Sequence, residues 1–379
     1  MKQQLRWFAA VCMLALGVIA CGEDDASTNP TTPDSQAISD TLKGNIKGTM
    51  KAGKTYYLTA DATVLKGDTL KIEPGVKLID LSNHALIIKG ALLAHGSKDS
   101  MIYMGPDAAR QTTGSWAGVL CDSPSVVSIK WCRLDYAGGI RPDGRPRPAI
   151  YYFSNAANTS EFYLEDCIIY KPKDDGFMLY GGKGHILRNQ FLWNGEVEGS
   201  GPNFKAGFKG KIAYNYIWSC TDQCIRVETG STVLFPQTDV EIYNNTIINS
   251  GHKNSSRPGA GVKIDLFSRA KVYNNIMVNT RLGLNITKKA DTANCMYGNN
   301  LFYTTVDSLQ QYFYPADGYG KPQSTDLIQV DPLFVKFNPD MNALTDDNDV
   351  HLQAGSPTLG KGNAAYDPDL GCFTAKRDK

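Results

Sequence analysis

A short phrase of apolar, aromatic and asparagine residues recurs five times between residues 186 and 303. Aligning the five copies places one polar position of each in a single series, with steps of 25, 30, 30 and 25 residues. The series consists of Gln190, Asn215, Asn245, Asn275 and Asn300. A fixed period in this range indicates stacked structural repeats. The repeat therefore constrains the fold more than any single motif does.

The repeat unit is too short for a propeller blade, which needs ~40 residues. The segments are rich in Ile, Val, Tyr, Phe, Thr and Asn and are punctuated by Gly, a composition typical of strands and turns. One coil of a parallel β-helix accommodates this length. Stacked strands lie ~4.8 Å apart, so equivalent residues form columns, and an inward column of asparagines can form a hydrogen-bonded ladder. The sequence predicts an all-β solenoid of this kind.

The pattern continues upstream, where Cys167 and Cys132 occupy the repeated position. Residues ~40–110 are interpreted as irregular first coils, because a solenoid needs atypical end repeats to shield its core. Residues 331–334 and 354–357 have the composition of a loop-rich C-terminal cap. The predicted β-helix domain, cap included, spans residues 41–379.

Several segments resemble the right-handed, pectate-lyase-like β-helix lipoproteins of bacteria. The resemblance rests on residues 67–75, 86–92, 115–118, 174–182 and the ending at 331–334 and 355–357, and it covers most of residues 40–365. It implies a right-handed parallel β-helix with irregular N- and C-terminal caps. It implies little about activity, because one fold hosts many functions.

The first 20 residues have the pattern of a secretion signal. Lys2 and Arg6 precede the apolar stretch 7–19, which is too short for a comfortable membrane span. Ala20 directly precedes Cys21, and this arrangement resembles a bacterial lipobox, which implies lipid attachment at Cys21. The alternative is an ordinary signal peptide with an incidental cysteine.

Residues 21–40 are polar, acidic and rich in Pro, so they cannot form a core and are predicted to be a flexible tether. An acidic run after the lipid-bearing cysteine is similar to the surface-export signals of some Gram-negative lipoproteins. We therefore expect a lipid-anchored protein on the surface of the outer membrane, with the periplasmic side as the alternative.

Charge argues against a nucleic-acid partner. Removal of residues 1–20 takes away two basic residues and leaves 37 against 38 acidic ones, a net charge of −1. Nucleic-acid binding proteins show a basic excess. No phosphate loop or nucleotide fingerprint is present, so no nucleotide cofactor is expected.

Besides the lipid-bearing Cys21, seven cysteines remain in the mature chain, and an odd number leaves at least one unpaired. Cys220 and Cys224 are close enough in sequence to bridge across a turn, whereas Cys132 and Cys167 are expected to be buried thiols of one interior column. None has the spacing of a zinc site. The disulfide state is left open for the whole set: Cys121, Cys132, Cys167, Cys220, Cys224, Cys295 and Cys372.

A second alignment concerns the strand that precedes each repeated phrase. Side chains alternate along a strand, so the middle residue of each should point outward. The predicted outward column is Met178, Lys205, Arg226, Lys263 and Asn285. Two positions further on, the outward set is Tyr180, Gly207, Glu228, Asp265 and Thr287.

Two interpretations of these columns are open. In the first, Lys205, Arg226 and Lys263 bind successive carboxylates or sulfates of an acidic polysaccharide, and Tyr180, Tyr214 or Trp218 offers its ring to a sugar face. In the second, the columns form an ion-pair ladder in which Arg226 and Lys263 meet carboxylates. Lys205 has no carboxylate beside it in this alignment.

Residues 201–207 look like the segment that carries the catalytic base in one family of β-helix polysaccharide lyases. This resemblance implies β-elimination with Lys205 or Arg226 as catalytic residues and Ca²⁺ held by Asp174 and Asp175. Asn203 departs from the glycine of that segment, and other calcium ligands of the family have no clear counterpart. Asp174 and Asp175 are also typical of a plain turn, so whether the protein is an enzyme stays open.

Two further functions are possible alternatives. A polygalacturonase-type glycoside hydrolase needs paired carboxylates, and Asp174 and Asp175 with His185 superficially match its motifs. A non-catalytic glycan-binding or adhesin-like surface protein would use the same rigid, repeated face without chemistry.

Overall fold

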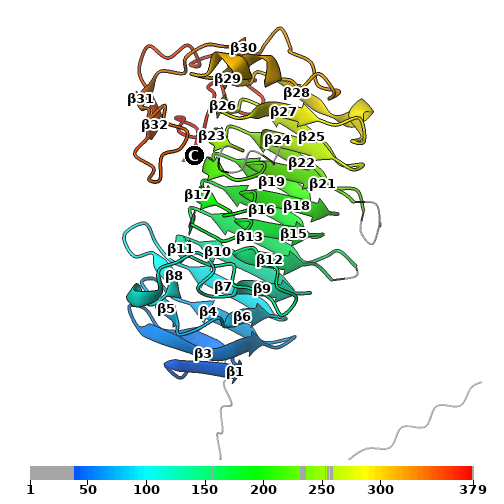
Figure 1. The fold of residues 1–379 in the computed structure, drawn as a ribbon. Coiled ribbons are helices and arrows are strands. Elements are labelled where there is room, and N and C mark those ends of the chain that lie inside the picture. Colours follow the sequence, from blue (N-terminus) through cyan, green and yellow to red (C-terminus); the bar gives the residue numbers. More distant parts are fainter. Residues whose placement is uncertain are drawn as a thin grey trace, which may run out of the picture. The chain divides into compact units, whose positions relative to one another are not determined.

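The computed structural model describes residues 38–377, apart from 156, 231–235, 252, 254–255 and 257–258. The predicted signal peptide, the lipid site at Cys21 and almost all of the tether lie outside the described residues. In the described part, the chain winds into a solenoid of stacked coils built from three parallel sheets (Figure 1). No helix in this part is both long and apolar enough for a transmembrane span.

Successive coils each add one strand to each sheet. Sheet 1 consists of β2 (Gly48–Met50), β4 (Thr69–Ile72), β7 (Ala91–His95), β10 (Val126–Lys130), β13 (Glu161–Glu165), β16 (Lys183–Leu187), β19 (Lys209–Ala213), β22 (Asp239–Tyr243), β25 (Arg269–Tyr273) and β28 (Met296–Gly298). Sheet 2 consists of β5 (Lys77–Asp80), β8 (Ile102–Pro106), β11 (Cys132–Asp135), β14 (Ile168–Tyr170), β17 (Gln190–Asn194), β20 (Tyr216–Cys220), β23 (Thr246–Ser250), β26 (Ile276–Val278), β29 (Leu301–Tyr303) and β30 (Leu327–Ile328). Sheet 3 consists of β6 (Ala85–Ile88), β9 (Gly118–Asp122), β12 (Ile150–Phe153), β15 (Phe177–Tyr180), β18 (Pro202–Ala206), β21 (Ile225–Glu228), β24 (Ala260–Asp265) and β27 (Leu282–Ile286).

The remaining elements lie at the ends and along the side. The long strand β3 (Thr55–Val64) runs through sheets 2 and 3 in the first coil and pairs with β1 (Thr41–Asn45). The two-stranded antiparallel sheet consists of β31 (Phe334–Lys336) and β32 (Asp349–Leu352). Three short 3₁₀ helices are η1 (Ala108–Arg110), η2 (Thr292–Asn294) and η3 (Asp307–Tyr312).

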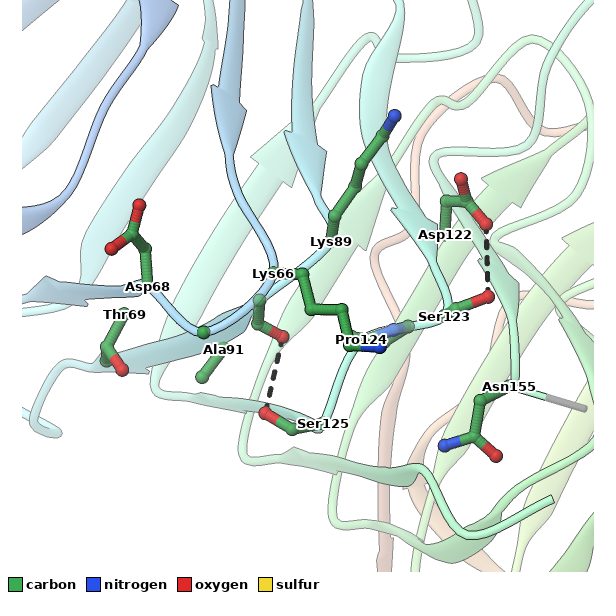
Figure 2. Close-up of a pocket in the computed structure, with 12 residues that line it drawn as sticks. Lys66, Asp68, Thr69, Lys89, Ala91, Asp122, Ser123, Pro124, Ser125 and Asn155 are labelled. Carbon is green, nitrogen blue, oxygen red and sulfur yellow. Dashed lines mark hydrogen bonds between the residues drawn. The ribbon is translucent and has the colours of Figure 1, made fainter. Parts of the chain in front are cut away.

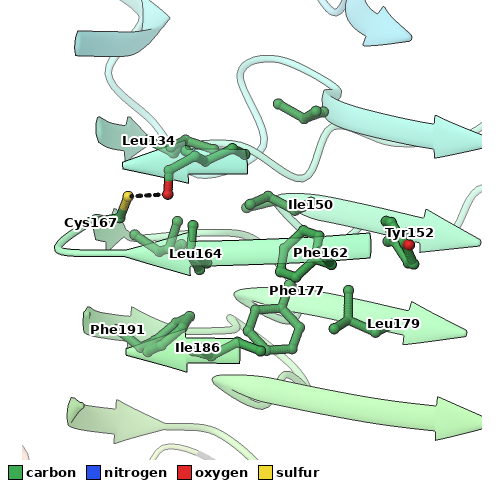
Figure 3. Close-up of a cluster of buried hydrophobic side chains, with 14 of the residues drawn as sticks. Leu134, Ile150, Tyr152, Phe162, Leu164, Cys167, Phe177, Leu179, Ile186 and Phe191 are labelled. Atoms are coloured by element: carbon green, nitrogen blue, oxygen red, sulfur yellow. Dashed lines mark hydrogen bonds between the residues drawn. The ribbon is translucent and has the colours of Figure 1, made fainter. Parts of the chain in front are cut away.

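Apolar side chains from all three sheets meet inside the coils. Phe177 of sheet 3 is fully buried, and its ring centroid lies 5.9 Å from that of Phe162 on sheet 1 and 5.7 Å from that of Phe191 on sheet 2 (Figure 3). Phe204, one coil further along sheet 3, lies 5.3 Å from Phe177. Such ring pairs add about 0.5–1.5 kcal/mol each beyond their buried area, so each coil is stabilised mainly by its neighbours.

An asparagine ladder runs along the corner between sheets 1 and 2. In each coil the backbone N–H donates to the side-chain Oδ1 of the next member at 2.9–3.1 Å, and the side-chain Nδ2 donates to that same oxygen. The ladder consists of Asn189, Asn215, Asn245, Asn275 and Asn300, all buried. It confirms the predicted column in every coil but the first.

The first member is Asn189, and the placement of Gln190 in this column is wrong. Strand pairing aligns Gln190 with Tyr216, so Asn189 aligns with Asn215. At this corner the side chain of Asn189, and not the longer one of Gln190, accepts the backbone N–H of the neighbouring coil. The ladder continues upstream through Cys167, whose N–H donates to Asn189 Oδ1 at 2.9 Å, and Cys132, whose N–H donates to Cys167 Sγ at 3.4 Å. These two thiols are buried, as predicted.

The residue before each ladder position adopts a left-handed backbone conformation. The φ values lie between 51° and 59° at Trp131, Asp166, Arg188, Tyr214, Asn244, Asn274 and Asn299. Asn tolerates this conformation better than other residues with a side chain, which explains the Asn–Asn doublets of the last three coils. We call this series the left-handed corner.

The C-terminal segment lies along the side of the solenoid (Figure 1). Its Phe334, Val350 and Leu370 pack on apolar residues of sheet 2 that point outward, among them Trp218 and Ile248. The predicted C-terminal cap segments 331–334 and 354–357 belong to this lateral cover. The end of the core is closed instead by the segment after β29, where Phe313 and Tyr314 stack on Phe302.

The left-handed corner holds the C-terminal segment in place. Side-chain Nδ2 groups donate to its backbone carbonyls: Asn299 to Lys361 at 3.0 Å, Asn274 to Asp367 at 2.9 Å and Asn244 to Asp369 at 2.8 Å. The segment therefore runs back along the corner toward earlier coils.

All seven cysteines of the described residues are free thiols. Six of them are buried, including Cys220 and Cys224, which do not form the disulfide that their spacing allows. Burial raises the pKa of Cys121 and Cys372, so these thiols behave as small apolar side chains.

Candidate functional site

Strand pairing in sheet 3 gives a different outward column from the predicted one. Pairing aligns Met178 with Asn203, Asn203 with Arg226, Arg226 with Lys263 and Lys263 with Asn285. The placement of Lys205 in this column is therefore wrong, because Asn203 occupies it.

The cause is a shift of two residues in β18. Phe204 pairs with Leu179 and Val227, not with Phe177 and Ile225, and the pairing of β15 with β18 is irregular between Leu179 and Tyr180. A shift of two residues preserves which side chains point inward. For this reason apolar alternation alone cannot detect it.

The shift brings Lys205 next to Glu228. Lys205 Nζ lies 2.5 Å from Glu228 Oε1, and Arg226 Nη2 lies 3.0 Å from Glu228 Oε2. Lys263 Nζ lies 3.0 Å from Asp265 Oδ2. The expectation that Lys205 has no carboxylate partner is wrong. The geometry of this face matches the ion-pair interpretation, and Glu228 is shared by Lys205 and Arg226.

Asp175 lies under this cluster and is almost fully buried. Its Oδ1 accepts from the Ser200 backbone N–H at 2.6 Å and its Oδ2 accepts from Asn203 Nδ2 at 2.8 Å. Burial raises the pKa of Asp175, while these two hydrogen bonds and the charges of Lys205 and Arg226 partly oppose the rise. The pKa of Asp174 is raised by burial and by the negative charges of Asp175 and Glu198.

These two aspartates do not form a cage for Ca²⁺. Within the described ranges, no three His, Cys, Asp or Glu side chains gather closely enough to hold a metal ion. Ca²⁺ takes about 6–8 oxygen ligands, and both oxygens of Asp175 are already engaged. Calcium binding stays a prediction.

An aromatic patch adjoins the charged cluster on the outer face of sheet 3. Tyr151 and Phe153 of β12 lie beside Tyr180 of β15, with ring centroids 5.8 Å and 5.9 Å from that of Tyr180. Burial is the main cause that raises the pKa of Tyr180 to about 12. Tyr151, Glu228 and Asp175 also raise this pKa, and the charge of Arg226 opposes the rise. Tyr180 therefore lies within electrostatic reach of Glu228 and Arg226.

Of the predicted rings, Tyr180 lies on this face, whereas Tyr214 and Trp218 are buried and contact the C-terminal segment. Tyr151 and Phe153 were not predicted. Their signal was present, because alternation along Ile150–Phe153 buries Ile150 and Tyr152 and turns the other two rings outward. The pairing of Tyr151 with Met178 and of Phe153 with Tyr180 then aligns the rings across coils.

A hollow borders the aromatic patch at the corner between sheets 3 and 1 (Figure 2). Its volume is about 570 Å³, and turns of four successive coils line it, the last through Asn155. Lys66 and Lys89 come from the first two turns, and Asp122 and Ser125 come from the third. Asp122 pairs with Phe153, so the hollow and the patch are continuous along the sheet.

The structure does not bring His185 to this face. His185 lies on β16 of sheet 1, where its Nε2 lies 3.0 Å from Glu165 Oε1. Asp174 and Asp175 precede β15 of sheet 3. The combination that suggested a polygalacturonase-type site is therefore split between two sheets.

Comparison with known families identifies the fold. A family model described as the right handed beta helix region matches residues 117–302, from the start of β9 to β29. Comparison with curated proteins finds no match. The matched region and the three parallel sheets show that this chain is a right-handed parallel β-helix protein, as the sequence predicted.

Proposed function

We propose that the outer face of sheet 3 binds an acidic polysaccharide. The observation that carries the proposal is that an aromatic patch and two cations share this face: Tyr151, Phe153 and Tyr180 lie on β12 and β15, and Lys205 and Arg226 lie on the next two strands, β18 and β21. Aromatic rings offer flat apolar surfaces to sugar faces. Arginine binds carboxylates and sulfates through paired, charge-assisted hydrogen bonds. A chain of acidic sugars presents both features repeatedly.

The ion pairs of this face are compatible with binding. Glu228 is shared by two cations, so the group of three side chains keeps one excess positive charge. The Arg226 side chain is 28% exposed, whereas that of Glu228 is 7% exposed. A polysaccharide carboxylate can therefore approach Arg226 from solvent while Glu228 holds the guanidinium in position.

Cleavage of the same polysaccharide is the second candidate function. It is favoured by the convergence of Lys205, Arg226 and the buried Asp175 at one place. In β-elimination a base removes the C5 proton of a uronate, the electron pair forms a C4–C5 double bond, and the C4–O bond breaks as the leaving oxygen gains a proton. Lys205 must be neutral to act as that base. Its pairing with Glu228 is typical of an ammonium group, so binding is the function that this geometry supports better.

Binding is tested by calorimetric titration with galacturonate, alginate and chondroitin sulfate oligosaccharides. Arg226→Gln is expected to weaken the affinity for the recognised sugar about tenfold, or ~1.4 kcal/mol. Arg269→Gln is the matched control, because Arg269 also pairs with one carboxylate but lies on sheet 1. Equal affinities of the two variants would contradict the proposal.

Cleavage is tested with the same sugars by the ultraviolet absorbance of the unsaturated product. If turnover is seen, Lys205→Ala is expected to abolish it and Lys209→Ala on sheet 1 to leave it intact. Turnover that survives in Lys205→Ala would exclude Lys205 as the base. If Ca²⁺ takes part through Asp174, chelation weakens sugar binding in the native protein but not in Asp174→Asn; unchanged binding by the chelated native protein would exclude that role.

We further propose that lipid at Cys21 anchors the protein to the outer membrane, on its outer surface. Support comes from the order of basic residues, apolar stretch, Ala20 and Cys21, followed by an acidic tether. In cell fractionation, Cys21→Ser should move the protein out of the membrane fraction. Protease treatment of whole cells distinguishes the outer surface from the periplasmic side.

A further inference from the structure

A second cavity lies at the corner between sheets 1 and 2, where the C-terminal segment reaches earlier coils. Its volume of about 670 Å³ is within the range of small-molecule sites, about 300–1,000 Å³. It lies on a different corner from the aromatic patch, so its role does not depend on the function proposed for sheet 3. The cavity is lined by Lys98, Trp131, Asp166, Arg188, His351, Phe373 and Arg377.

The floor of the cavity is made by the left-handed corner. Trp131, Asp166 and Arg188 are consecutive members of that series. In later coils the same position is Asn, which binds the backbone of the C-terminal segment. In the cavity coils the position carries large or charged side chains, although a left-handed conformation is unfavourable for a bulky residue. Trp131, Asp166 and Arg188 line the cavity.

The wall is an aromatic and cationic stack from the C-terminal segment. The His351 and Phe373 rings are stacked with centroids 4.0 Å apart, and the Arg377 guanidinium lies 4.2 Å from the Phe373 ring centroid. Across the cavity, Trp131 is half-buried and belongs to the lining, so a ligand in the cavity can reach it.

The charges of the lining favour an anion. Asp166 is the one carboxylate of the lining, and Arg188 holds both its oxygens, with Nε–Oδ1 and Nη2–Oδ2 distances of 2.8 Å. Arg188 Nη2 also lies 3.0 Å from Glu165 Oε2, and Glu165 Oε1 lies 2.8 Å from Lys130 Nζ, so these four charges balance. Asp166 presents acceptor oxygens suited to sugar hydroxyls. Lys98 is exposed and forms no ion pair within the described part of the chain, so its ammonium adds a positive charge to the lining.

We propose that this corner cavity binds an anionic sugar residue. The Trp131 indole would lie against the sugar face, Asp166 and Arg188 would bind its hydroxyls, and Lys98 would bind its acid group. The acid can be a uronate carboxylate or a sulfate, which share this recognition chemistry. A site here would hold a saccharide at a second point of the molecule.

The decisive variant is Trp131→Asn. Asn is the residue that later coils use at the same left-handed position, so the backbone should be unstrained while the indole is lost. Lys98→Gln removes the exposed cation, and Lys54→Gln is its control, because Lys54 is also exposed but does not line the cavity. All variants are made in an Arg226→Gln background, so that weakened binding at sheet 3 cannot mask the result.

The probes for calorimetric titration are a galacturonate tetrasaccharide, a chondroitin sulfate tetrasaccharide and neutral maltotetraose. We expect one of the acidic probes to bind, Trp131→Asn to weaken its binding at least tenfold, and Lys98→Gln to weaken it at least threefold with no effect of Lys54→Gln. Which acidic probe binds distinguishes carboxylate from sulfate.

Three results would overturn the proposal. They are unchanged affinity in Trp131→Asn, equal binding of maltotetraose, and no binding of either acidic probe. If Trp131→Asn no longer unfolds cooperatively, the proposal is judged by comparing the affinities of Lys98→Gln and Lys54→Gln for the acidic probe. If these tests fail but Arg226→Gln alone still weakens the binding of the acidic sugar, the proposal for sheet 3 stands.

Discussion

At the scale of single residues, one buried carboxamide joins each coil to the next. Asn245 accepts from the backbone N–H and the side chain of Asn215, and it donates to Asn275 Oδ1 and the Ile212 carbonyl. Asn245→Ala would leave several of these buried groups unsatisfied, at about 1–3 kcal/mol each. We expect a loss of about 3 kcal/mol or more in the free energy of unfolding, measured by urea denaturation.

The control for that substitution is Asn294→Ala, since Asn294 is exposed. Exposed positions usually change stability by less than about 0.5 kcal/mol. Similar losses in both variants would show that the ladder does not stabilise the stack.

Glu165 makes the stability of the solenoid depend on pH. A hydrogen bond with His185 lowers the pKa of Glu165 to about 2; burial opposes this, and Lys130 lowers it further. A carboxyl whose pKa is lower in the folded protein stabilises it above the unfolded pKa of about 4.3, and this stabilisation is lost as the pH falls toward 2.

Glu165→Gln should therefore destabilise the protein by about 2 kcal/mol at pH 7, and the difference from the native protein should shrink between pH 4 and pH 2. Thermal unfolding across this pH range measures it. Glu241→Gln is the control on the same sheet, since Glu241 pairs with one exposed lysine. A difference at pH 7 that persists unchanged at pH 2 would contradict this assignment.

At the scale of strands, the close stacking of sheet 1 depends on small residues. A Cβ built on Gly210 would lie 2.0 Å from the Gly184 carbonyl oxygen of the neighbouring coil. Gly210→Ala should therefore push β19 away from β16 and lower the free energy of unfolding by about 2 kcal/mol.

The matched control is Gly355→Ala, whose Cβ meets nothing within 4 Å. Removing a glycine at such an open position is neutral or slightly stabilising. If calorimetry finds equal melting temperatures for the two variants, then sheet 1 accommodates the methyl group by local movement.

The register of single strands marks the boundary of what the sequence predicts. The period of the Asn phrases was sufficient to predict the solenoid and its inward column. It was insufficient for Lys205, because a shift of two residues in β18 leaves the inward and outward pattern unchanged. The charged cluster around Glu228 depends on that shift. The contacts of the C-terminal segment with Asn244 and Asn274 could not be predicted from the sequence either, because they join residues more than 90 positions apart.

At the scale of the whole solenoid, the C-terminal segment covers an apolar strip of sheet 2. Leu370 is fully buried against this strip, whereas Leu344 of the same segment is 71% exposed. Leu370→Ala should lower the free energy of unfolding by about 2–4 kcal/mol. It should also increase the binding of an apolar fluorescent dye, because Trp218 and Ile248 become accessible.

Leu344→Ala should change neither property. If Leu370→Ala behaves like Leu344→Ala, the segment is an independent appendage and cannot position the wall of the corner cavity. That result would weaken the second saccharide site but not the first.

The measurement that most directly tests the central proposal is a crystal structure with the acidic oligosaccharide that binds best in titration. We predict sugar rings packed on Tyr151 and Tyr180, with an acid group within about 3 Å of the Arg226 guanidinium. An oligosaccharide bound elsewhere, with the outer face of sheet 3 left empty, would contradict it.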